Sequence, residues 1–213
     1  WHGPPGANPD FAAVDLLASI MGTAGTGRLH KQLVEPKLAA AAFGFAWGLA
    51  EPSPFFLGAQ LAPGQDVERA KAQLLATVDN LVKQPITSAE VDRAKTRWLN
   101  DWERGFTDPE VIGVELSEAL SRGDWRLYFV QRDHVRKLTA ADVQRVATQR
   151  LRRDNRTVGI YLPTDKPERA PAPAVPDVAA IVGNYQGDAT AAMAEVFDTA
   201  TANLDKRTQS RTL

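Results

Sequence analysis

Two neighbouring runs with strand-like patterning constrain the fold most, because the sequence around them is patterned for helices. Residues 39–50 place their aromatic side chains at alternate positions, namely Phe43, Phe45 and Trp47. A period of two is typical of a β-strand. Residues 55–61 form the second run, and two prolines punctuate the residues between the runs. Because the connection is short, the pair is expected to form an antiparallel hairpin.

Helix signals lie on both sides of this hairpin. Apolar residues recur at helical spacing between Phe11 and Ile20, and Gly22 is expected to end that helix. A second helix is expected from about Arg28 to Pro36. After the hairpin, residues 66–84 carry one apolar stripe. Further helices are expected to begin at capping residues, in the stretches Thr87–Glu90, Asp108–Glu110, Asp124 and Thr139–Asp142.

The end of the chain differs in composition from the part before it. Residues 155–162, NRTVGIYL, are rich in β-branched and aromatic residues and predict a third strand. Residues 163–176 then contain five prolines, which is typical of an extended linker. We therefore expect an α/β (α+β) domain at 1–162, followed by a Pro/Ala-rich linker and connector at 163–213.

Bulk composition excludes several classes of protein. The 213 residues carry a formal net charge of -1, which lacks the basic excess of a nucleic-acid-binding domain. No apolar run approaches the roughly 18 residues that a membrane span requires. Without cysteine the chain has no disulfide, thiolate zinc site or cysteine nucleophile. Because it begins at Trp1 with no leader-like stretch, we expect a piece of a longer protein.

The stretch MGTAGTGRLHKQLVE, residues 21–35, admits three interpretations. A phosphate-binding loop is disfavoured, since the glycines follow a helix and Arg28-Leu29 stands where Lys-Ser/Thr belongs. A flexible turn between two helices, with Gly22 as a left-handed cap, explains the glycines without any ligand. A loop that contacts a peptide is the third possibility.

The sequence shows no set of residues that could carry out catalysis. The histidines, His2, His30 and His134, are far apart, and a zinc protease helix needs two imidazoles one turn apart. The serine nucleophile motif Gly-x-Ser-x-Gly is also missing. Trp98 and Trp102 stand four apart on an expected helix, a spacing that favours core packing over a binding stack. No catalytic or metal-ligating residue is therefore assigned.

The order of these pieces resembles the pitrilysin/insulinase-type zinc metallopeptidase family, at its second, non-catalytic domain. The resemblance rests on NPDFAAVDLLASIMGTAGTGRLHKQLVEPKLAAAAFGF, on ITSAEVDRAKTRW and on the closing LTAADVQRVATQRLRRDNRTVGIYLP. It spans residues 1–162. The tail AEVFDTATANLDKRT is similar to the connector that precedes the second half of double-length bacterial members.

The resemblance implies a two-layer sandwich, in which helices cover one side of a mainly antiparallel sheet, as in LuxS and the mitochondrial processing peptidase. Two such halves would enclose peptide or unfolded polypeptide. The catalytic domain of the same chain would supply zinc and the Glu base from an H-x-x-E-H helix, which is absent here. This chain would then shape the peptide chamber and hold no cofactor itself.

Residue by residue, the resemblance implies a substrate-contacting loop built from Gly22, Gly25, Gly27 and Arg28, as in the processing-peptidase branch. The family's Ser-Ser-Arg-Leu stands here as Thr26-Gly27-Arg28-Leu29, a departure at that loop. Residues 58–66 lack the arginine and tyrosine of the far half of the clamshell, which favours the domain paired with the catalytic one.

Two further expectations follow from the resemblance alone. The parent is expected to be a bacterial protein that is periplasmic or otherwise exported. An alternative also remains open, in which the parent has lost its metal ligands and serves as a structural or assembly subunit of the same fold.

Overall fold

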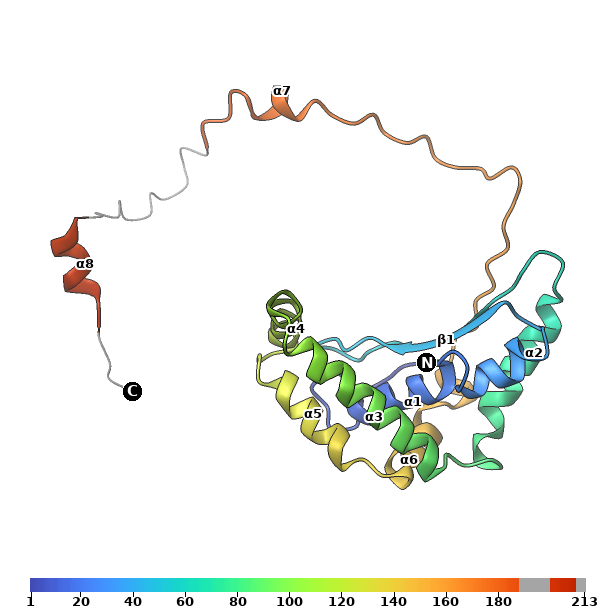
Figure 1. Ribbon diagram of the computed structural model, residues 1–213. Coiled ribbons are helices and arrows are strands. Elements are labelled where there is room, and N and C mark those ends of the chain that lie inside the picture. The colour runs from blue at the N-terminus through green and yellow to red at the C-terminus, as the bar shows by residue number, and fades with distance from the viewer. Residues whose placement is uncertain (188–199, 210–213) are drawn as a thin grey trace. The chain divides into compact units, whose positions relative to one another are not determined.

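The structure is a computed structural model that describes residues 1–187 and 200–209. It divides into two compact units, Trp1–Ile160 and Tyr161–Leu213. The first unit contains a two-stranded sheet with helices on one side (Figure 1). This arrangement confirms the α+β class and the helix-covered antiparallel sheet.

The sheet is the expected hairpin. β1 (Ala41–Ala46) pairs antiparallel with β2 (Phe55–Gln60), in a register that joins Ala41 to Gln60 and Ala46 to Phe55. The N-terminal residues extend the far edge of β2, because Trp1 and Phe55 exchange hydrogen bonds. Gly3 and Ser53 do the same one rung further along.

Helix α1 (Phe11–Gly22) forms the centre of the core. It contacts both strands on one side and the helices α3, α5 and α6 on others. Nearly every residue of α1 is buried, including the large side chains of Leu16, Leu17 and Met21. A helix that is apolar all round must be enclosed on all sides, so the sheet and the outer helices pack around α1.

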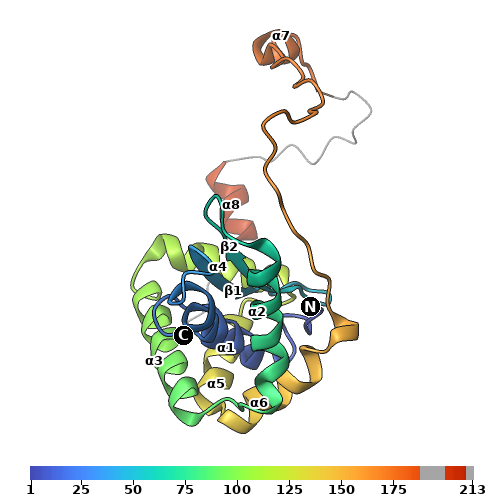
Figure 2. The same cartoon turned by 90° about the vertical axis from the view of Figure 1, so that its right-hand side faces the viewer.

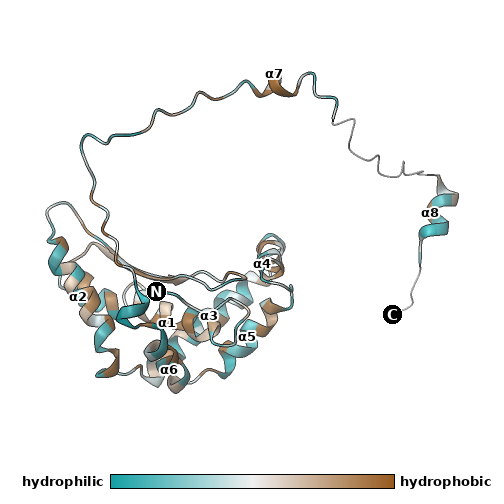
Figure 3. Ribbon diagram, turned by 180° about the vertical axis from the view of Figure 1, so that it is seen from behind, coloured by the Kyte–Doolittle hydropathy of each residue, from teal (hydrophilic) through white to brown (hydrophobic). Residues whose placement is uncertain are grey.

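The remaining helices follow the expected order. They are η1 (His30–Val34), α2 (Val67–Asp79), η2 (Asn80–Val82), α3 (Ser88–Gly105), α4 (Pro109–Ser121), α5 (Leu127–Lys137), α6 (Ala140–Arg150) and η3 (Arg153–Asn155). The expected helix starts at Thr87 and Thr139 are confirmed, and both are capping boxes, in which the threonine side chain accepts from the amide of Glu90 or Asp142. Figure 3 shows hydrophobic and hydrophilic residues mixed along the outer helices.

The expected third strand is wrong. Asn155 ends η3, and residues 156–162 adopt no strand; Val158, Ile160 and Tyr161 are exposed. A strand forms only where a neighbour pairs with its backbone. Asn155 does bond to His2, but the segment that follows finds no strand partner among the described residues. This segment therefore has high β-propensity but no neighbouring strand with which it could pair among the described residues.

The described residues of the second unit contain little regular structure. Residues 163–177 adopt no helix or strand, as a proline-rich linker should. Two short helices follow, α7 (Val178–Val182) and α8 (Thr201–Arg207), and neither contains a buried residue. Part of the expected connector, residues 194–199, lies outside the described residues. Within the described part of the chain, no helix is long and apolar enough to cross a bilayer.

Candidate functional site

The glycine-rich loop after α1 is shaped by two different requirements. Gly22 is the last residue of α1, and a Cβ there would lie 1.9 Å from the backbone nitrogen of Gly44 in β1. The left-handed conformation belongs to Gly25, at φ 77, which corrects its assignment to Gly22. Gly22 is therefore required by close packing, whereas Gly25 is required by the turn itself.

Gly27, like Gly22, is required by close packing. A Cβ on Gly27 would lie 2.6 Å from the carbonyl oxygen of Thr23, and the Gly27 amide donates to that same oxygen. By contrast, a Cβ on Gly25 would meet nothing within 4 Å. The middle of the loop therefore stands open, while its two ends are packed tightly.

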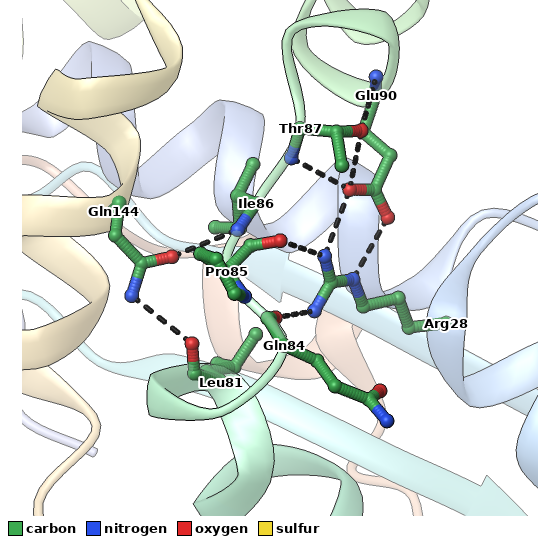
Figure 4. Close-up of polar contacts among 8 residues, drawn as sticks. All are labelled: Arg28, Leu81, Gln84, Pro85, Ile86, Thr87, Glu90 and Gln144. Atoms are coloured by element: carbon green, nitrogen blue, oxygen red, sulfur yellow. Dashed lines mark hydrogen bonds and ion pairs between the residues drawn. The ribbon is translucent and has the colours of Figure 1, made fainter.

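Arg28 joins this loop to the start of α3 (Figure 4). Its Nε and one terminal nitrogen donate to the two carboxylate oxygens of Glu90, each at 2.8 Å. The terminal nitrogens also donate to the carbonyls of Gln84 and Pro85, at 2.6 and 2.8 Å. The guanidinium group therefore makes its hydrogen bonds within the domain. Arg28 thus holds the loop against the start of α3.

Glu90 has a perturbed pKa because of this contact. The hydrogen bonds from Arg28 are the main cause, followed by those from Thr87 within the capping box, and they lower the pKa of Glu90 from 4.5 to about 2. The carboxylate is therefore ionised at every physiological pH. The ion pair is mostly shielded from solvent, with 16% and 18% of the two side chains exposed.

Gln144 of α6 holds the same segment from the other side. Its amide oxygen accepts from the backbone nitrogen of Ile86 at 2.8 Å, and its amide nitrogen donates to the carbonyl of Leu81 at 3.1 Å (Figure 4). The connection between η2 and α3 is therefore fixed by polar contacts at both faces. Arg28 bonds to Gln84 and Pro85 of this connection and so joins it to the glycine-rich loop.

The helix-free side of the sheet carries an aromatic face. We use this name for Phe43, Phe45 and Trp47 with Phe56, which are 45%, 44%, 61% and 40% exposed. Their ring centroids lie 6.1 Å apart for Phe43 and Phe45, 4.7 Å for Phe45 and Phe56, and 6.3 Å for Phe45 and Trp47. Four contiguous rings therefore stand open to solvent.

A small residue makes this face possible. Phe43 lies opposite Gly58 in the sheet, and a Cβ on Gly58 would come within 2.2 Å of the Phe43 ring. The ring thus lies flat over the backbone of β2. Sequence reasoning identified the aromatic alternation of β1 but not which side faced the helices. Gly58 on β2 was the sequence feature that could have indicated the side on which the rings lie.

The other candidate residues from the sequence are potential metal ligands and the two tryptophans of α3. No cluster of three or more His, Asp or Glu side chains that could hold a metal ion occurs among them. The two tryptophans of α3 pack as expected: Trp98 donates to Asp15 at 2.8 Å, and Trp102 stacks on Tyr128 and Phe106.

Comparison with known proteins supplies the family. Residues 1–97 match the model of the peptidase M16 inactive domain. The zinc protease PqqE of Helicobacter pylori is 26% identical over 161 residues, which are 75% of this chain and 36% of that protein. The chain thus spans about a third of the length of this curated relative.

Solved structures match a larger share of the chain than the family model does. A candidate zinc protease from Bordetella pertussis is 44% identical, with a TM-score of 0.71 over 77% of this chain and 91% of that one. The inactive peptidase domain of a candidate zinc protease from Bordetella parapertussis is 46% identical, with a TM-score of 0.73 over 81% and 92%. This chain therefore belongs to the family of M16 peptidase inactive domains.

Proposed function

We propose that this domain forms one wall of the peptide chamber of a zinc metalloendopeptidase. A catalytic domain of the same protein would supply the zinc and the glutamate base, and this domain would supply surface and support. The proposal is supported by the zinc protease relatives and by the lack of a metal-ligand cluster among the described residues. Zinc-activated water would then attack a peptide held partly by this domain.

The aromatic face is the observation that carries the proposal. Exposed rings in one contiguous patch are unusual on a free surface and mark a contact site. Phe45 and Phe56 stack at 4.7 Å, so the patch is preformed and little side-chain entropy is lost on binding. Aromatic rings bind apolar side chains of many shapes, which suits a protease that takes unfolded polypeptide.

The glycine-rich loop is the second contact we assign to peptide. Its open middle, at Gly25, leaves backbone free to approach an extended chain. Gly22 and Gly27 fix the loop ends by packing, and Arg28 anchors the loop to Glu90. Under this proposal Arg28 positions the loop, and the peptide contacts the loop backbone.

The proposal is tested in the protease that contains this domain together with its catalytic partner. The double substitution Phe45→Ser and Phe56→Ser is expected to raise KM for an unfolded protein substrate about tenfold, since two apolar contacts are lost. Val82→Ser is the matched control, because Val82 is an apolar side chain on η2 that is 73% exposed. Zinc content should be unchanged in both variants.

Two outcomes would contradict the proposal. Unchanged KM and kcat in the aromatic-face variant would show that this surface does not contact substrate. A parent protein that binds no zinc and cleaves no peptide would favour the alternative, a structural or assembly subunit of the same fold.

A further inference from the structure

A polar groove runs between the glycine-rich loop and α3. Its volume is about 550 Å³, within the range of small-ligand sites. One wall is the end of α1 and the loop, with the hydroxyl groups of Ser19, Thr23 and Thr26. The other wall is one side of α3 from Glu90 to Arg104. Figure 2 shows α3 along the flank of the first unit.

Two arginines in this groove have no acidic partner. Arg93 and Arg97 stand one turn apart on α3, and both line the groove. Neither makes an ion pair or a side-chain hydrogen bond with the described residues, although most arginines of this domain do. Unpaired guanidinium groups that face the same hollow form a binding position for an anion.

The charges around the groove leave a single positive excess. Glu90 is neutralised by Arg28, and Asp101 is neutralised by Arg104. Asp92 also lines the groove and offsets one of the two remaining guanidinium groups. A ligand with one negative charge therefore complements the groove better than a doubly charged phosphate does.

Backbone donors without an acceptor also lie in the loop beside the groove. The amides of Ala24, Gly25 and Thr26 find no acceptor among the described residues. They surround the left-handed Gly25, and consecutive amides in such a turn form a concave donor set that suits an oxyanion. Thr26, which carries one of these amides, lines the groove together with Thr23, whereas Ala24 and Gly25 are not among its lining residues.

From these features we propose that the groove binds a peptide carboxylate, with Arg93 and Arg97 as its cationic anchors. The carboxylate is either the C-terminus of a peptide or an acidic side chain within one. A guanidinium group matches a carboxylate with two parallel hydrogen bonds, and the Thr26 amide at the groove wall supplies a neutral donor. This proposal deepens the loop contact of the proposed function and rests on it there, but none of the aromatic-face residues lines the groove, so the two tests can fail separately.

The test is a titration of the 213-residue chain followed by NMR of its backbone amides. The probes are N-acetyl tetra-alanine with a free C-terminus, the same peptide with a C-terminal amide, N-acetyl-Ala-Asp-Ala-amide and inorganic phosphate. Binding of a carboxylate peptide should shift the amides of residues 23–27 and should weaken as salt is added. The free-acid and aspartate probes tell the two carboxylate sources apart.

Matched variants complete the test. The double variant R93Q/R97Q should bind the carboxylate peptide about tenfold more weakly or worse. Arg69→Gln is the control, because Arg69 is an exposed arginine on α2 that has no side-chain partner among the described residues and does not line the groove. Both variants should melt at the wild-type temperature, since neither removes a contact of the fold.

Several results would overturn the proposal. Equal affinity for the amidated tetra-alanine would show that no carboxylate is recognised. Unchanged affinity in R93Q/R97Q would show that the two arginines do not bind the peptide. Tighter binding of inorganic phosphate than of either carboxylate peptide would assign the groove to a different anion.

Discussion

The two faces of the hairpin differ in burial, and only one of them belongs to the core. Phe55 and Phe56 are consecutive in β2, yet Phe55 is 3% exposed and Phe56 is 40% exposed. On the inner face of β1 the residues are small, and a Cβ on Gly44 would meet the carbonyl oxygen of Ala18 at 2.6 Å. The larger rings of β1 lie on the outer face. Size alone therefore does not tell which side of a strand is core.

The largest expected effect separates these two phenylalanines. Phe55→Ala should lower the free energy of unfolding by about 3–4 kcal/mol, because it opens a cavity in the core. Phe56→Ala should cost about 1 kcal/mol, the value of an exposed aromatic pair. Urea denaturation of both variants measures the difference. Equal losses would mean that the outer face is part of the fold's core.

The next prediction concerns the contact between α1 and β1. Gly22→Ala should cost about 3 kcal/mol, since the added Cβ would lie 1.9 Å from the nitrogen of Gly44 and neither backbone can move freely. Gly113→Ala in α4 is the control, because its Cβ meets nothing within 4 Å. That variant should gain about 0.5–1 kcal/mol from helix propensity. A thermal melt in which both variants match the wild type would refute the close packing.

Glu90 gives a pH-dependent prediction. Its pKa is lowered to about 2 in the folded state, so its stabilisation is complete above about pH 4.5 and is lost as the pH falls toward 2. Glu90→Gln should cost about 2 kcal/mol at pH 7, after allowance for solvent screening, and the gap should close by pH 2. Glu68→Gln removes an exposed pair with Lys71 and should change stability by less than about 0.5 kcal/mol. A gap that persists unchanged at pH 2 would contradict the ion-pair account.

Asp15 gives the opposite sign and the smallest effect. Burial raises the pKa of Asp15, while hydrogen bonds from Trp98 and Gln131 only partly oppose that shift. Because the folded pKa is raised, Asp15 favours folding at low pH, and its charge becomes a cost as the pH rises through that pKa. Asp15→Asn should therefore stabilise the chain at pH 7 and have no effect near pH 3. If Asp15→Asn instead lost stability only at neutral pH, the prediction would be contradicted.

The sequence contained most of the local structure but not the long-range relations. Caps such as Thr87 and Thr139 are recognisable because the residues involved are three positions apart. The strand expected at 155–162 failed because pairing depends on a neighbour, which propensity does not encode. The role of Gly22 was also missed, since the backbone it touches lies in β1, beyond the reach of a local pattern.

At the candidate sites, too, the sequence indicated local features but not long-range contacts. The glycines and Arg28 were noticed, but the partner of Arg28 is Glu90, which is 62 residues away. The groove arginines, Arg93 and Arg97, carry no sequence signal beyond their one-turn spacing on α3. That they are unpaired can be recognised only when the ion pairs of the neighbouring charges are known from the three-dimensional structure.

Photo-crosslinking tests the central claim, that the aromatic face contacts peptide, most directly. A benzophenone side chain would replace Phe45 in the protease that contains both domains, or Val82, which is exposed on η2, as the control. The account predicts that an unfolded protein substrate crosslinks to position 45, that unlabelled substrate competes, and that position 82 stays unlabelled. Labelling at position 82 equal to that at position 45, or no labelling at position 45, would contradict it.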